Sequence, residues 1–328
     1  MSGRAAGWVA SVIGVVGLVV AVHPAAALDD IPEPVPVEIS VPAIPQVGGE
    51  LPAVTMAAEL FLPAGAGPFP VVIYSHGRAS KPEERAGLKT PIPRGHANYW
   101  MRKGFAVVAP IRPGYGVAGA VDRERSGTRI EADNSCGGTP RLPAAAEVSA
   151  TAVSAAVDWT RQQRWAVKDR ILLVGTSAGG LASLAAAAKR PPGVVGVVNF
   201  SGGAAGYPRE RPQASCGEAL LTEVFRRAGR DAKVPSLWLY AENDQYWGAQ
   251  APRAWHAAFA AGGSPARFVM TPPVPNEDGH RLMLRGGRMW SMHVDPFVVE
   301  LGFKAPTVAA PKPAPARSSG AVSSPEPE

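Results

Sequence analysis

The sequence has 328 residues, of which 46% are hydrophobic and 18% are charged, and its formal net charge is +6. This composition allows a large α/β domain with a sizeable core, and it excludes a chain that is disordered or membrane-embedded throughout. The basic residues are scattered along the chain, so no nucleic-acid-binding surface is predicted.

Residues 1–27 have the layout of a secretory signal peptide. Arg4 precedes an apolar run over residues 7–22, and the small-residue stretch 25–27 follows, as at a signal-peptidase site. We expect cleavage after Ala27 and export to the periplasm or the extracellular space, without membrane attachment afterwards. An uncleaved membrane anchor is the alternative, although the apolar run is short for a spanning helix.

The remaining chain is predicted to contain an N-terminal extension (28–53), one α/β domain (54–303) and a disordered tail rich in Pro, Ala and Ser (304–328). In the domain, β-rich runs alternate with helical stretches, which is typical of a mostly parallel sheet with helices on both faces. The predicted strands are 54–62, 70–74, 105–110, 170–175, 194–200, 236–241 and 266–270. The predicted helices are 96–103, 144–164, 178–189, 217–228, 249–261 and 288–303.

The stretch Gly175–Gly179 reads G-x-S-x-G, with Ser177 at its centre. The bare pattern is a weak signal, but an apolar strand (171–174) precedes it and an Ala-rich helix (181–188) follows it. On such a strand-to-helix turn the serine hydroxyl is held above the sheet, and the helix N-terminus supplies amide groups for a developing oxyanion. Ser177 is therefore the candidate nucleophile.

A serine nucleophile needs a base and a carboxylate that orients the base, and in this architecture they follow the serine in that order: carboxylate, then histidine. The strand 236–241 runs into Glu242-Asn243-Asp244, so Asp244 is the candidate orienter and Glu242 the competitor. After the last predicted strand, a polar turn leads to a histidine that can return over the sheet edge.

That histidine, His280, is the candidate base. His256, in a predicted helix, and His293, next to the last helix's packing residues, are the alternatives, and both are expected to have structural roles.

An early strand (71–74) ends in the turn Ser75-His76-Gly77-Arg78. This H-G turn is placed to aim a backbone amide at the substrate carbonyl oxygen, and we assign the oxyanion hole to the amides of Arg78 and Ala178. His76 is expected to brace the turn.

The loop region 112–143 is long and has no clear period, so it is expected to be functional. Gly114–Gly119 matches G-x-G-x-x-G, but no apolar helix period follows, so a pocket rim is favoured over a dinucleotide site. Tyr115, Tyr246 and Trp247 are expected to form an aromatic wall of the substrate pocket.

Cys136 and Cys216 are the only two cysteines. In an exported protein an even count without metal-type spacing predicts a disulfide. The sequence contains no H-E-x-x-H pair, no P-loop lysine and no cysteine cluster, so neither a metal nor a cofactor is predicted.

Taken together, these motifs resemble the dienelactone hydrolase-like branch of the α/β-hydrolase superfamily over about residues 54–303. The resemblance is carried by His76-Gly77 and by the stretches 175–180, 239–244 and 278–280. It implies an ester hydrolase without a cofactor, with Ser177, Asp244 and His280 as nucleophile, orienter and base. Dienelactone hydrolases proper have a cysteine nucleophile, and the serine here argues against dienelactone as the substrate.

The sequence thus predicts an exported serine hydrolase that cleaves a carboxylic ester or related acyl bond of a small molecule. A prolyl oligopeptidase-like peptidase is the first alternative, because such enzymes share the fold and the triad. A non-catalytic exported binding protein of the cell envelope is the second. The sequence makes no prediction of the oligomeric state.

Overall fold

The computed structural model describes residues 32–46, 49–79, 81–119 and 121–304. The predicted signal peptide and nearly all of the predicted tail lie outside these residues, so both remain predictions. Within the described residues, every helix is too short or too polar to cross a bilayer.

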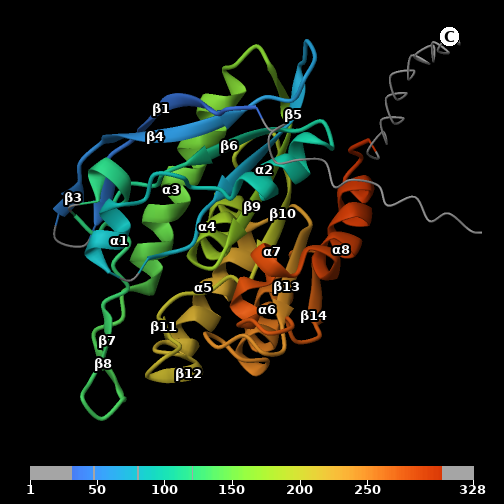
Figure 1. The fold of residues 1–328 in the computed structure, drawn as a ribbon. Helices are drawn as coiled ribbons and strands as arrows, with labels where there is room; N and C mark the ends of the chain where they lie inside the picture. The colour runs from blue at the N-terminus through green and yellow to red at the C-terminus, as the bar shows by residue number, and fades with distance from the viewer. Residues whose placement is uncertain (1–31, 47–48, 80, 120, 305–328) are drawn as a thin grey trace, which may run out of the picture. The chain divides into compact units, whose positions relative to one another are not determined.

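The core of the fold is an eight-stranded sheet with the strand order β1-β4-β6-β5-β9-β10-β13-β14 (Figure 1). The pairs β1–β4 and β4–β6 are antiparallel, and all other neighbours are parallel. The strands are β1 (Val35–Val41), β4 (Val54–Phe61), β5 (Phe69–Ser75), β6 (Ala106–Pro110), β9 (Ala166–Thr176), β10 (Val194–Phe200), β13 (Ser236–Ala241) and β14 (Ala266–Thr271).

Three small antiparallel pairs accompany the main sheet. They are β2 (Ile44–Gln46) with β3 (Gly49–Leu51), β7 (Thr128–Ile130) with β8 (Cys136–Gly138), and β11 (Gly206–Tyr207) with β12 (Arg211–Ser215).

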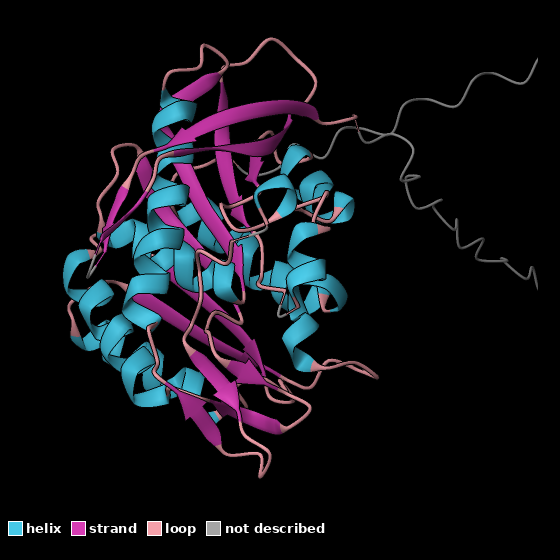
Figure 2. Ribbon diagram, turned by 90° about the vertical axis from the view of Figure 1, so that its left-hand side faces the viewer, coloured by secondary structure: helices cyan, strands magenta, loops and turns pink. Residues whose placement is uncertain are grey.

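Helices cover both faces of the sheet (Figure 2). Helices α3, α4, α5 and α6 pack on one another in chain order and form one layer. Helix α2 contacts β6, helix α8 contacts β13, and α2 and α8 also contact each other. The helices are α1 (Pro82–Ala86), α2 (Arg94–Met101), α3 (Leu142–Arg161), α4 (Ala178–Ala188), α5 (Glu218–Asp231), α6 (Gln250–Ala261), α7 (Leu282–Arg285) and α8 (Gly287–Glu300), with 3-10 turns η2 (Gly116–Ala118) and η3 (Gly279–Arg281).

The predicted fold class is confirmed, and every predicted strand and helix has a counterpart. The inner strands β6 and β13 are buried at every position, as expected for strands of a sheet that helices cover on both faces. Val35–Val41, in the predicted N-terminal extension, form β1 and pair with β4, a strand that the sequence analysis did not predict. The prolines around this segment, including Pro36 within the strand, obscured it. An edge strand tolerates them because, among the described residues, β1 pairs on one side only.

The long loop region between β6 and α3 contains short elements of secondary structure. Gly114–Gly119 leads into the single turn η2 rather than into an α-helix, so the βαβ unit of a dinucleotide site is not formed. Farther along, the β7–β8 hairpin projects from the domain and carries Cys136 at the start of β8.

The α2 and α8 layer contains a cluster of aromatic rings around His96. This histidine is 5% exposed, and its ring lies 5.5 Å from those of Tyr74 and Trp290. Its Nε2 accepts a hydrogen bond from the indole of Trp100 at 3.1 Å. Burial lowers the pKa of His96 from 6.5 to about 3, so the folded chain holds this ring neutral.

This burial makes stability depend on pH. In the unfolded chain His96 takes up a proton near pH 6.5, whereas in the folded chain it does so only near pH 3. The free energy of unfolding is therefore unaffected by this group above pH 6.5 and falls as the pH drops from 6.5 towards 3. In urea titrations at a series of pH values, the wild type should lose about 1 kcal/mol more per pH unit in this window than His96→Phe does. A difference between the two proteins that stays constant with pH would contradict this assignment.

Candidate active site

Ser177 lies at the sharp turn between β9 and α4, with φ of 55° and ψ of −125°. This left-handed backbone is strained for a residue with a side chain. The turn is crowded, because a Cβ on Gly175 would lie 2.1 Å from the carbonyl oxygen of Gly179. A Cβ on Gly179 would lie 2.0 Å from the carbonyl oxygen of Ser75, at the end of β5. Both glycines of the motif are therefore required by close backbone contacts.

The structure brings Ser177, His280 and Asp244 together from three separate parts of the chain. The Ser177 Oγ lies 3.0 Å from His280 Nε2, and His280 Nδ1 lies 3.0 Å from Asp244 Oδ2. Since Nδ1 faces a carboxylate, it carries the proton, and Nε2 is free to accept the serine proton. The arrangement can activate the hydroxyl for attack on an acyl carbon.

Asp244 follows β13 and is fully buried. Its Oδ1 accepts hydrogen bonds from the amides of Tyr246 and Trp247 at 2.8 and 3.1 Å. These bonds fix the carboxylate so that it faces the His280 ring. The competitor Glu242 is exposed and forms none of these contacts.

Two side chains that the sequence analysis did not single out tie the Asp244 turn to the His280 turn. The Asp278 Oδ1 accepts from the amides of Gln245 and His280, each at 2.9 Å. The Asn243 side chain accepts from the amide of Val274 and donates to its carbonyl oxygen. Polar residues directly beside a catalytic candidate are the only sequence signal for such a role.

His280 is enclosed by the two aromatic residues that follow Asp244. The ring of Tyr246 stacks on it with centroids 3.9 Å apart, and Trp247 meets it edge-on at 5.4 Å. The alternative bases lie elsewhere: His256 lies in α6 and contacts Trp238 of β13, and His293 lies in α8.

The H-G turn after β5 is held by a chain of hydrogen bonds through His76. The amide of Arg112 donates to His76 Nε2 at 3.1 Å, so Nδ1 carries the proton and donates to the carbonyl oxygen of Gly77 at 2.7 Å. Burial and the Arg112 charge hold the pKa of His76 well below its usual range, which keeps this neutral tautomer. The Gly77 carbonyl belongs to the same peptide unit as the Arg78 amide, so fixing one orients the other.

Both amides assigned to the oxyanion hole remain available. In the described part of the chain, neither the Arg78 nor the Ala178 amide donates to another protein group. The turn lies against the nucleophile, because a Cβ on Gly77 would be 3.4 Å from the Ser177 Cβ. This placement is what an oxyanion hole requires.

Arg112 anchors the turn from behind. It is fully buried and forms a two-point ion pair with Glu124, at 2.6 and 3.1 Å. Its Nη1 also donates to the His76 carbonyl oxygen at 2.7 Å. Tyr115 belongs to the same network: it is 2% exposed and donates to Glu124 at 2.9 Å. The prediction that Tyr115 lines the substrate pocket is therefore corrected, because its hydroxyl is used to satisfy a buried carboxylate.

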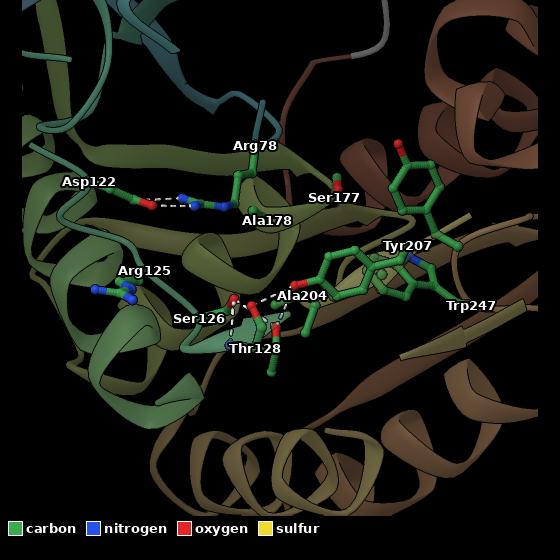
Figure 3. Close-up of a pocket in the computed structure, with 14 residues that line it drawn as sticks. Arg78, Asp122, Arg125, Ser126, Thr128, Ser177, Ala178, Ala204, Tyr207 and Trp247 are labelled. Atoms are coloured by element: carbon green, nitrogen blue, oxygen red, sulfur yellow. Dashed lines mark hydrogen bonds and ion pairs between the residues drawn. The ribbon is translucent and has the colours of Figure 1, made fainter. Parts of the chain in front are cut away.

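A pocket of about 210 Å³ opens beside Ser177 (Figure 3). Tyr246 and Trp247 are in its wall, as predicted, and Tyr207 lies across from Ser177. The loop region after β6 adds Asp122, Arg125, Ser126 and Thr128, and the segment after β10 adds Gly203, Ala204, Ala205 and Gly206. Arg78 points away from Ser177 to Asp122, with which it forms two hydrogen bonds at 2.9 and 2.5 Å.

The far wall of this pocket is formed by two hairpins that are joined covalently. Thr128, in β7, hydrogen-bonds the Tyr207 hydroxyl, which belongs to β11. Cys136, in β8, forms a disulfide with Cys216, directly after β12, and this confirms the predicted bridge. Among the described residues, no group of His, Cys, Asp and Glu side chains is placed to hold a metal ion.

With this geometry established, comparison with known proteins identifies the family. Residues 52–216, half of the chain, match the X-Pro dipeptidyl-peptidase family, S15. The chain belongs to the S15 family. The match contains the H-G turn, Ser177 and both cysteines, whereas Asp244 and His280 follow it. No curated protein matches the chain.

Solved structures show the same fold at low identity. An acylaminoacyl peptidase of Pyrococcus horikoshii has 14% identity and a TM-score of 0.55, with 86% of this chain and 43% of that chain covered. A putative dienelactone hydrolase of Klebsiella pneumoniae has 17% identity and a TM-score of 0.51, with 81% and 99% covered. An esterase of Pyrococcus furiosus has 14% identity and a TM-score of 0.53, with 82% and 91% covered.

The S15-family chain thus has the α/β-hydrolase fold and falls among the serine hydrolases of that fold, as the sequence predicted for the superfamily. The family that matches is a peptidase family. The dienelactone hydrolase-like branch, which the sequence resembles, appears in these comparisons as a solved structure with the same fold. The chain spans less than half the length of the Pyrococcus horikoshii peptidase.

The Cys136–Cys216 disulfide joins the two hairpins of the pocket wall, so we expect its removal to destabilise the protein. Cys136→Ala/Cys216→Ala should lower the free energy of unfolding by about 2–4 kcal/mol, because the unfolded chain loses a constraint across 80 positions. Urea unfolding of this double variant measures the effect, and reduced wild type is the control that should behave like it. Equal midpoints for the oxidised wild type and the variant would contradict the expectation.

Proposed function

We propose that the chain is an exported serine hydrolase that cleaves small carboxylic esters through an acyl-enzyme. The observation that carries the proposal is the continuous hydrogen-bonded line from Ser177 Oγ through His280 to the buried Asp244. The strained serine turn beside two available amides supports it. The N-terminal sequence pattern supports export.

In the proposed mechanism, His280 Nε2 takes the proton of Ser177 as the oxygen attacks the acyl carbon. The amides of Arg78 and Ala178 stabilise the negative charge on the carbonyl oxygen, and Asp244 stabilises the imidazolium. His280 then gives the proton to the leaving alkoxide. Water, activated by the same histidine, attacks the acyl-enzyme and releases the acid. Besides the substrate and this water, each step uses only groups of this chain.

A dipeptidyl-peptidase activity is the second candidate, and the family match favours it. An X-Pro dipeptide has a protonated amine two residues before the bond that is cut, and a buried amine needs a carboxylate partner. Among the described residues that line the 210 Å³ pocket, Asp122 is the only carboxylate. Burial disfavours its ionisation, but Arg78 outweighs this and lowers the pKa of Asp122, so its charge is already paired. This pairing favours an ester over a dipeptidyl substrate.

The triad can be tested with two substrates and three variants. Ser177→Ala and Asp244→Asn should each lower kcat/KM for 4-nitrophenyl acetate by at least about 10³-fold, whereas the neighbouring Glu242→Gln should leave it unchanged. The wild type should hydrolyse this ester faster than Gly-Pro-4-nitroanilide. Normal ester hydrolysis by Ser177→Ala, or no reaction of the wild type with a fluorophosphonate, would reject the mechanism. A preference for the anilide would instead support the dipeptidyl-peptidase.

The role of His76 as a positioning residue can be separated from general damage. His76→Phe removes the donor that fixes the Gly77–Arg78 peptide, so it should lower kcat/KM for an ester by about 10- to 100-fold. A thionoester depends less on oxyanion hydrogen bonds, so its hydrolysis should fall less and the ester-to-thionoester ratio should drop. The matched control is His96→Phe, because His96 is also a buried, neutral histidine. This variant should keep the wild-type ratio of ester to thionoester hydrolysis. Equal ratios in both variants would show that His76 does not act through the oxyanion hole.

A further inference from the structure

A second hollow adjoins Ser177 beside the 210 Å³ pocket. It has a volume of about 190 Å³, and Ser177, Arg78 and Tyr246 belong to the walls of both. The two differ in which catalytic groups line them: His280 lines only the 190 Å³ hollow, and Ala178, of the proposed oxyanion hole, lines only the 210 Å³ pocket. The nucleophile therefore has two flanks, and the base stands on one of them.

The position of the base assigns the two flanks to the two parts of an ester. His280 Nε2 must donate its proton to the leaving oxygen, so the alcohol part lies on the flank that His280 lines. The acyl part then occupies the 210 Å³ pocket, whose wall includes Tyr207 and Trp247. A pocket of this volume, bounded by the disulfide-linked hairpins, suits a short acyl group.

The alcohol flank continues beyond the site along helix α7. Met283 and Leu284, which line the 190 Å³ hollow, also line a neighbouring hollow of about 480 Å³ between α2 and α8. The 480 Å³ hollow is also bordered by Pro93, Tyr99 and Trp290. Leu284 is 49% exposed although it is a large hydrophobic residue, and it stands where the two hollows meet.

The charges around this path are at its rim or already paired. Asp295 accepts a hydrogen bond from the Tyr99 hydroxyl and lies 2.8 Å from the ammonium of Lys103. Arg288 is exposed at the surface. Arg281, which also lines the 190 Å³ hollow, lies 2.7 Å from Glu277. The apolar side chains of Met283, Leu284 and Trp290 contribute to the walls of the path, and an alkyl chain gains from contact with such groups.

We propose that the two hollows form one α7 groove, lined by Met283, Leu284 and Trp290, that binds the linear alkyl chain of the alcohol part of an ester. The inference rests on the proposed serine hydrolase activity and names its substrate class: short-acyl esters of longer alkyl alcohols. Exposure of Leu284 is then explained by the ligand that covers it.

The chain offers a steric test from both walls of the groove. Gly287, at the first position of α8, and Gly95, in α2, both line the 480 Å³ hollow, and a Cβ on either meets no atom within 4 Å. Gly287→Trp and Gly95→Trp can therefore fill the groove without displacing the protein around the Cβ. Gly287→Ala is the matched control, because it changes the backbone freedom of the position but adds little volume.

The experiment measures kcat/KM for methyl, butyl and octyl acetate from acetate release, beside a series of 4-nitrophenyl esters of increasing acyl length. For the wild type, kcat/KM should rise by about two- to fourfold for each methylene of the alcohol that enters the groove. It should not rise with acyl length. Gly287→Trp and Gly95→Trp should each lower the ratio of kcat/KM for octyl acetate to that for methyl acetate by at least about tenfold. Gly287→Ala should keep the wild-type ratio.

The groove and the proposed function fail in different ways. A wild type that hydrolyses methyl acetate and 4-nitrophenyl acetate but shows no gain with alcohol length would overturn the groove and leave the hydrolase standing. The same holds if chain-length preference follows the acyl part, or if both tryptophan variants, folded as judged by circular dichroism, keep the octyl advantage. A wild type inert towards all of these esters and towards a fluorophosphonate would overturn both.

Discussion

The site depends on the close approach of two backbone turns, at the ends of β5 and β9. Gly179 lies so near the carbonyl oxygen of Ser75 that no side chain fits between them. This contact sets the distance between the nucleophile and the turn that carries the Arg78 amide. It also leaves Ser177 in a conformation with positive φ that the rest of the fold must sustain. The buried sheet strands on either side supply the rigidity that such strain needs.

Around this contact, hydrogen bonds fix the orientations of the polar side chains. His76 is held by an amide on one nitrogen and holds a carbonyl with the other. Asp244 accepts two amides and the imidazole, and Asp278 ties the two loops that bring the carboxylate and the base together. Because these hydrogen bonds hold each group, its orientation is set before any substrate arrives, which is the property that electrostatic catalysis requires.

Local motifs predicted the parts of the site that one segment determines. The strand, glycine and helix pattern around Ser177 predicted its turn. Asp244 and His280 were predicted from chain order together with their positions, just past a strand end and after a polar turn. Tyr115 was wrongly placed because its environment depends on the Arg112–Glu124 pair, whose partners are separated by a loop without periodicity. β1 was missed because its prolines are unfavourable inside a sheet and acceptable only at an edge. The two hollows beside Ser177 arise from side chains of distant helices and hairpins, and no sequence pattern describes them.

The edge position of β1 has a consequence for how the folded chain meets its neighbours in solution. A strand at the margin of a sheet exposes unpaired amides and carbonyls, which invite another chain to add to the ladder. Pro36 has no amide hydrogen to offer, and Glu38, two positions on, brings a charge to the same strand. Self-association through intermolecular β-pairing is thereby disfavoured at this margin. That protection matters for a protein expected to leave the cytoplasm and its chaperones.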